Sequence, residues 1–283
     1  MRLLLALLLS MVTLAGHGQL VLGNAVLSQY ARSAPSGEWT PADLGSKLKL
    51  WNRSDDISGG NGDPKNVWTN YALASSWATN ATASYLPVVT NSSLFGNRNV
   101  LWFTSDYLTY TNAGEPVLAT SSAMSNCSIV VVFASDDSAL GRTPFFISKG
   151  NASASSRCYV VLDTTTDGFK GGGRILDADS FEATSSASAL PATIPFIGQA
   201  DFIFTDGDVV LYTNNIVAVN DTSWHDASAG MSQTNSSLNF TIGCAWNTEF
   251  LAGQVGEILF VVPQLTPPER TNTYTYLKNK FGL

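Results

Sequence analysis

The sequence has little charge and no basic run. Only 13% of the 283 residues are charged, whereas 45% are apolar. This balance indicates a globular chain, because disordered chains combine high charge with low apolar content. The formal net charge of -7 argues against nucleic-acid binding, which needs clustered lysine and arginine. Serine, threonine, asparagine and glycine must supply most of the polar surface, as suits extracellular or virion proteins.

Histidine and cysteine are also scarce. Two histidines, His17 and His225, nearly exclude a histidine-based metal site and weaken any Ser-His-Asp or Cys-His scheme. Three cysteines, Cys127, Cys158 and Cys244, form no CxxC pair and lie in or beside apolar runs, where cysteine packs as a small apolar residue. The odd number allows at most one internal disulfide, and the sequence leaves open whether any pair forms.

No apolar run is long enough to span a membrane. Residues 3–15 are almost wholly apolar, which is the length of the apolar part of a signal peptide, and small residues follow, with possible cleavage sites after Gly18 or Ala25. We therefore expect an apolar N-terminal segment at 1–25, either a signal peptide or an arm for assembly. Residues 26–38 are predicted to be a linker, and the chain is expected to be extracellular, either secreted or on a virion surface.

Asn-x-Ser/Thr sequons are numerous, which favours a glycosylating secretory route. Two of the eight, at Asn126 and Asn239, adjoin predicted strands. The remaining six are the glycosylation candidates: Asn52, Asn80, Asn91, Asn151, Asn220 and Asn235.

Short apolar runs at regular spacing predict many strands. The run at 127–134 is the clearest, because it is β-branched, apolar and too short for a helix. Residues 99–110 predict two strands around Ser105-Asp106, and Asn214-Asn215 predicts a tight hairpin turn. The other predicted strands cover 48–50, 143–148, 157–163, 169–170, 174–176, 202–204, 209–213, 216–219, 238–245 and 254–262.

The chain ends with the pattern of a short helix. Thr266 can cap it, Pro267 suits the first helical position, and Glu269 can complete a capping box. Gly282 ends the pattern. The predicted fold is all-β, an antiparallel two-sheet jelly-roll β-sandwich with a short C-terminal helix, in one domain at 39–283.

The order of these pieces resembles a known family. The matching segments are 39–44 with 48–51, then 67–68, 100–103 with 106–108, 128–133, 256–259 and 265–270. Together they resemble the concanavalin A-like lectin/glucanase (laminin-G-like) jelly-roll domain, of the kind found in bacteriophage and other virion proteins. The resemblance implies a β-sandwich and leaves the function open, because this fold hosts lectins, glycosidases and structural modules.

One acidic run, Asp177 to Glu182, resembles the catalytic strand of glucanases on this fold. A retaining glycosidase needs two carboxyl groups about 5 Å apart, one of them with a raised pKa. Here the first acid is the shorter aspartate, and a Gly171-Gly172-Gly173 run and a Ser/Ala tract flank the motif in place of apolar strand residues. We therefore interpret it as a polar surface loop and expect no enzyme activity.

A second acidic loop offers oxygen ligands for calcium. Asp55, Asp56, Asn61 and Asp63 lie in one Gly-rich stretch, and Asp136-Asp137 lie in another. The spacing differs from that of an EF-hand, and a solvated acidic loop is the alternative. No other cofactor is expected.

Tryptophan could supply rings for a glycan. The six candidates are Trp51, Trp68, Trp77, Trp102, Trp224 and Trp246. Most of them alternate with apolar strand residues and are therefore expected in the core. The exception is Trp224-His225-Asp226, which lies in a predicted loop and is the ligand-binding candidate.

These observations favour a non-catalytic virion-surface or assembly protein, such as a capsid decoration or tail-associated subunit. Its partners would be copies of itself, other virion proteins and, weakly, cell-surface glycans. The alternative is a secreted lectin-like module that binds glycans, with or without calcium. An endoglycosidase is the third hypothesis.

Overall fold

The computed structural model describes residues 37–73, 76–110, 126–136, 145–149, 157–162, 168–187, 190, 193–232, 238–245 and 249–283. The chain from Ser36 to Leu283 forms one compact unit. Among the helices described, none is both long and apolar enough to cross a membrane.

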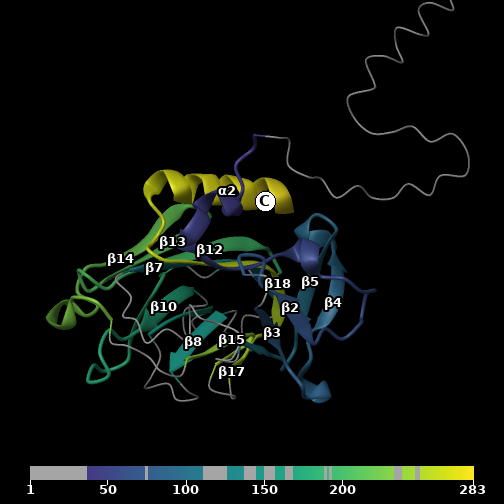
Figure 1. The fold of residues 1–283 in the computed structure, drawn as a ribbon, viewed down its shortest axis with the longest axis horizontal. Helices are drawn as coiled ribbons and strands as arrows, with labels where there is room; N and C mark the ends of the chain where they lie inside the picture. Colours follow the sequence, from purple (N-terminus) through teal and green to yellow (C-terminus); the bar gives the residue numbers. More distant parts are fainter. Residues whose placement is uncertain are drawn as a thin grey trace, which may run out of the picture. The chain divides into compact units, whose positions relative to one another are not determined.

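Two antiparallel sheets make up this unit (Figure 1). Sheet A has the order β14-β13-β12-β7-β18-β5-β4, and β1 pairs with β18 beside β5. Its strands are β1 (Leu48–Asn52), β4 (Val88–Ser92), β5 (Arg98–Phe103), β7 (Cys127–Ser135), β12 (Phe196–Ile203), β13 (Asp208–Thr213), β14 (Ile216–Asp221) and β18 (Gly253–Val261).

Sheet B has the order β11-β10-β9-β8-β15-β6-β3-β2. Its strands are β2 (Val67–Thr69), β3 (Trp77–Thr79), β6 (Leu108–Tyr110), β8 (Phe145–Lys149), β9 (Cys158–Leu162), β10 (Phe169–Gly173), β11 (Glu182–Ser185) and β15 (Leu238–Ile242). A small ribbon of β16 (Cys244–Ala245) and β17 (Glu249–Phe250) pairs separately.

The main core lies between the two sheets. Alternation along β7 sends Ile129, Val131 and Phe133 into this core, and they are fully buried there. The residues between them, Val130 and Val132, point to the other face and are also buried. Sheet A is therefore covered on both faces, which explains why every residue of β7 is buried.

The C-terminal helix α2 (Pro267–Phe281) covers the second face of sheet A (Figure 1). Leu277 and Phe281 are buried against strand residues of that face. Thr266 and Glu269 form the predicted capping box, and Gly282 ends the helix in the left-handed conformation. A short 3-10 helix, η1 (Pro41–Lys47), contributes Leu44 to the same core.

The structure confirms the antiparallel β-sandwich with one C-terminal helix. The predicted strands at 127–134 and 99–110 and the Asn214-Asn215 turn, where both residues have positive φ, are confirmed. The prediction of a strand at 174–176 is wrong. This segment bends at Ile175, where Asp179 Oδ2 accepts hydrogen bonds from the amides of Ile175 and Leu176.

Strands β2, β3, β4, β11, β17 and most of β12 were not predicted. In β12 the pattern is interrupted by Gly198, Gln199 and Asp201. Gly198 is required there because a Cβ would lie 2.7 Å from the Phe169 ring across the core. Gln199 and Asp201 face the layer under α2. There Gln199 donates a hydrogen bond to Asp201, and Asp201 also accepts from Arg270. Contacts with residues distant in sequence thus determine strand β12, and the local sequence pattern gives no information on them.

Candidate functional site

Three aromatic rings from distant parts of the chain meet where several connecting segments converge. Tyr85 ends the short helix η3 (Ala83–Tyr85), Tyr107 lies between β5 and β6, and Phe250 lies in β17. Ring centroids are 5.8 Å apart for Tyr85 and Tyr107, 6.5 Å for Tyr85 and Phe250, and 6.4 Å for Tyr107 and Phe250. These separations are those of interacting aromatic pairs. We call these three residues the aromatic triad.

The aromatic triad is partly exposed. Tyr85 keeps 41% of its surface accessible, and Tyr107 and Phe250 are half-buried. Large apolar side chains that gather at the surface mark binding sites more often than isolated ones do. Tyrosine also offers a flat apolar face and a hydroxyl at its tip, so the triad can hold an amphipathic ligand.

A buried amide holds the two tyrosine segments together. Asn80 Nδ2 donates to the carbonyl oxygens of Tyr85 at 3.1 Å and Tyr107 at 2.9 Å, and its Oδ1 accepts from the Thr82 amide at 2.8 Å. The Tyr107 amide also donates to the Tyr85 carbonyl. Asn80 is only 7% exposed. The backbone below the rings is thus fixed before any ligand arrives, which lowers the entropy cost of binding.

Two tryptophans are exposed elsewhere. Trp77 on β3 is 50% exposed, and Trp102 on β5 is 38% exposed and donates its indole N–H to Asp136. The structure places Trp51, Trp68 and Trp224 in the interior. Trp246 lies outside the described residues.

The structure does not favour the predicted ligand-binding candidate Trp224-His225-Asp226, because Trp224 and His225 are buried. Trp224 is 2% exposed, packs on Phe202 and Phe204, and donates its indole N–H to the Glu182 carbonyl at 3.1 Å. His225 is 7% exposed, with Nε2 3.1 Å from the Gly173 carbonyl oxygen.

The loop can pack this closely because Gly207 faces it. A Cβ on Gly207 would lie 2.5 Å from the Asp226 amide nitrogen, so only glycine lets the two backbones approach. Asp226 is exposed, and its Oδ1 accepts from the next amide, that of Ala227. The sequence gives no sign of this long-range contact.

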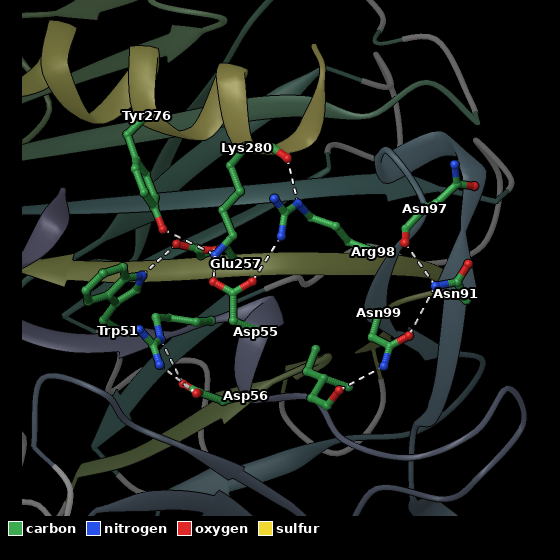
Figure 2. Close-up of polar contacts among 12 residues, drawn as sticks. Trp51, Asp55, Asp56, Asn91, Asn97, Arg98, Asn99, Glu257, Tyr276 and Lys280 are labelled. Carbon is green, nitrogen blue, oxygen red and sulfur yellow. Dashed lines mark hydrogen bonds and ion pairs between the residues drawn. The ribbon is translucent and has the colours of Figure 1, made fainter. Parts of the chain in front are cut away.

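The structure also does not support the calcium site predicted in the loop from Asp55 to Asp63. Asp55 binds Lys280 at 2.7 Å and Arg98 at 3.0 Å, and Asp56 binds Arg53 at 2.7 Å (Figure 2). Burial by itself would raise the pKa of Asp55, but Lys280 and Arg98 outweigh it and lower that pKa. These two carboxylates are therefore already neutralised by side-chain cations.

The other two proposed ligands bind elsewhere. Asn61 Oδ1 accepts from the Asn91 amide at 3.2 Å, and Asp63 Oδ2 accepts from the Gly60 amide at 2.6 Å. Within the described residues, no three acidic, histidine or cysteine side chains are grouped as metal ligands. The four predicted residues thus do not converge on one cation.

The predicted sequons divide by burial. Asn52 is fully buried and donates to the carbonyl oxygens of Trp68 and Thr69, and Asn80 is buried as described above. Both side chains are therefore inaccessible in the folded protein, which argues against a glycan at either position. Asn91 and Asn220 are exposed.

Asn126 is half-buried. Asn151 and Asn235 lie outside the described residues, as does the side chain of Asn239.

The acidic run on the predicted loop holds structure together. Asp177 Oδ1 lies 2.6 Å from Nη2 of the fully buried Arg157 and 3.5 Å from Arg174. Asp179 accepts from two backbone amides and from Ser228 Oγ at 2.5 Å. Burial would raise the pKa of Asp179, but these hydrogen bonds lower it. Glu182 is exposed on β11.

A cavity of about 380 Å³ lies at the N-terminal end of α2. Arg270 Nη2 binds Asp201 Oδ2 at 3.1 Å, and the guanidinium lies 4.0 Å from the Tyr212 ring centroid. Asp201 Oδ1 also accepts from Ser128 and Gln199. Burial raises the pKa of Asp201 despite these partners. Because Arg270 covers the Tyr212 ring and pairs with the acid, this cavity offers no open aromatic face.

The chain matches no protein-family model and no curated protein sequence. It is similar in structure to domain 4 of a GH43 extracellular arabinanase from Geobacillus stearothermophilus in complex with arabinotriose. That match has 13% identity and a TM-score of 0.50, and it covers 81% of this chain and 98% of that one.

It is also similar to a Trypanosoma rangeli sialidase in complex with sialic acid, at 12% identity and a TM-score of 0.55, over 83% of this chain and 33% of that one. A third similar structure is of botulinum neurotoxin type C, whose cell entry depends on interaction with two ganglioside molecules. It shares 9% identity at a TM-score of 0.52, over 84% of this chain and 53% of that one. The chain thus spans about a third of the sialidase's length. These likenesses establish the β-sandwich fold.

Proposed function

We propose that residues 39–283 form a non-catalytic glycan-binding module that acts outside the cell. The observation that carries the proposal is the aromatic triad of Tyr85, Tyr107 and Phe250. A sugar ring has one face of C–H groups that packs on an aromatic ring and a rim of hydroxyls that needs hydrogen-bond partners. Partly exposed tyrosines on a fixed backbone supply both kinds of contact.

Two further observations support this proposal. Among the similar structures, one is in complex with arabinotriose, one is in complex with sialic acid and one is of a toxin whose cell entry depends on gangliosides; the arabinotriose complex is a separate domain of similar size. Within the acidic run, Asp177 and Asp179 are engaged by Arg157 and by backbone amides, which favours a structural role over catalysis. None of the three compared structures is of a virion protein, so the assembly role stays a prediction.

The test is a glycan array probed with the full chain from a secretory host, with and without a chelator. We expect binding that does not depend on the chelator, because the acids of the 55–63 loop are paired with cations or backbone groups. Tyr85→Ala and Tyr107→Ala should each weaken the Kd for a positive glycan roughly tenfold or more, as loss of a buried aromatic contact usually does.

Trp77→Ala is the matched control, because it removes an exposed ring from β3 and leaves the triad intact. Silence across the array would overturn glycan binding as the function. Binding that survives the tyrosine changes but is lost with Trp77→Ala would move the site to sheet B.

A further inference from the structure

Two of the cysteines touch across the interface between the sheets. Cys127 begins β7 in sheet A, and Cys158 begins β9 in sheet B. Both side chains are fully buried in the main core, and their Sγ atoms are 3.9 Å apart. The third cysteine, Cys244, lies in the β16–β17 ribbon.

This separation is that of two thiols in van der Waals contact. A disulfide needs an S–S distance of about 2.0 Å, so the sulfurs must approach by about 2 Å. Rotation about χ1 can move a sulfur by that amount.

We propose that Cys127 and Cys158 are a cross-link site, at which a disulfide joins the two sheets when the chain folds in an oxidising compartment. The proposal does not depend on glycan binding. It requires only the fold and exposure of the unfolded chain to a low-molecular-weight disulfide such as oxidised glutathione.

The chemistry is two successive thiol–disulfide exchanges. The thiolate of one cysteine attacks a sulfur of oxidised glutathione, forms a mixed disulfide and releases one glutathione. The thiolate of the second cysteine then attacks the protein sulfur of the mixed disulfide, closes the protein disulfide and releases the second glutathione. The two cysteines are oxidised, one glutathione disulfide is reduced, and the two thiol protons end on the two released thiols.

The order of events follows from burial. In the finished sandwich no oxidant can reach either sulfur, and burial raises the pKa of the Cys127 thiol, which suppresses the reactive thiolate. The exchange must therefore precede closure of the sandwich. Protein folded under reducing conditions should keep both thiols, and protein folded under oxidising conditions should keep the bond.

A bond here would stabilise the fold. It closes a loop of 31 residues and ties β7 of sheet A to β9 of sheet B. Restricting the unfolded chain in this way raises stability for loops of such length. For a domain of this size we expect the melting temperature to rise by roughly 5–15 °C.

The experiment unfolds and reduces the full chain, then refolds it either with a glutathione redox pair or with excess reductant. Both samples are alkylated in denaturant and digested without reduction. We expect a linked Cys127–Cys158 peptide and the higher melting temperature only in the first sample. Folded, reduced protein exposed to oxidised glutathione should gain the link only after denaturant is added.

Variants separate the outcomes. Cys244→Ser should retain the linked peptide, and Cys127→Ser and Cys158→Ser should each abolish it and remove the gain in melting temperature. Should a serine variant fail to fold, the peptide map of the unmodified chain decides alone. Alkylation of both Cys127 and Cys158 after oxidative refolding, or a link to Cys244, would overturn the proposal.

Discussion

Lys280 Nζ lies 2.6 Å from Glu257 Oε2, and both side chains are almost completely buried between α2 and sheet A (Figure 2). Glu257 Oε1 accepts from the Trp51 indole at 2.6 Å, and Lys280 also pairs with Asp55. Burial alone would lower the pKa of Lys280, but Glu257 and Asp55 raise it. An ionic network therefore holds the C-terminal end of the helix against sheet A.

Breaking this pair from one side should be costly. In Glu257→Gln the amide oxygen can still accept from Trp51, but Lys280 loses its buried counter-charge. Removal of one member of a buried pair usually costs about 3–5 kcal/mol, and Asp55 remains to reduce that. We expect a loss of about 2–4 kcal/mol in the free energy of unfolding, measured by urea denaturation.

The double variant Glu257→Gln with Lys280→Met serves as the control. It removes both charges, so it should recover part of the loss, because no unpaired charge stays buried. This account of the network would be contradicted if the double variant lost more free energy of unfolding than the two single variants lose together.

A second prediction concerns acid stability at the other end of α2. Glu269 Oε2 accepts from the amide and hydroxyl of Thr266 and lies 2.5 Å from Lys47 Nζ. Burial would raise the pKa of Glu269, but Lys47 and Thr266 lower it below its usual 4.5. A lowered folded-state pKa adds stability above the unfolded-state pKa, and this contribution is lost as the pH falls through the folded-state value.

Glu269→Gln should therefore be less stable than the unmodified chain at pH 7, by about 0.5–1 kcal/mol for a capping and ion-pair contribution. The difference in the free energy of unfolding should shrink as the pH is lowered from 7 to 3. Denaturation curves at several pH values check this, and a difference that grows on acidification would refute it.

Glycan mapping tests the division of the sequons. In folded protein from a glycosylating host, enzymatic deglycosylation in heavy-oxygen water should label Asn91 and Asn220 and leave Asn52 and Asn80 unlabelled. The physical reason is that the Asn52 and Asn80 amides are buried and hydrogen-bonded to backbone carbonyls. A labelled Asn80 in folded protein would mean that the segments bearing Tyr85 and Tyr107 are not held as the structure shows.

The sequence predicted the fold correctly in those segments where the local sequence pattern matches the burial of the side chains. The apolar strand at 127–134 and the capped helix after Thr266 carry their own signals, and both were predicted. The candidate site could not be predicted in this way, because Tyr85, Tyr107 and Phe250 are brought together by long-range contacts, among them the hydrogen bonds from Asn80 to the Tyr85 and Tyr107 carbonyls. The position of Trp224 could not be predicted for the same reason. Its loop is buried through contacts with Gly173 and Gly207, and no local sequence feature indicates these contacts.

The Gly171-Gly172-Gly173 run yields the last prediction. It forms part of β10, and Gly173 has a φ of 148°. A Cβ there would lie 2.1 Å from the carbonyl oxygen of Arg157, the residue before the paired strand β9, a clash with backbone that no side-chain rotation relieves. Gly173→Ala should therefore lower the free energy of unfolding by more than 3 kcal/mol, through combined strain and overpacking.

Gly230→Ala separates these two causes. Gly230 has a φ of 150°, nearly the same as Gly173, but a Cβ there would meet nothing within 4 Å. Its loss should be limited to backbone strain, about 1–2 kcal/mol. Thermal and urea denaturation of both variants measure the difference. Equal losses would show that the close approach of β10 to β9 contributes nothing, and that the glycine run is needed only for its backbone conformation.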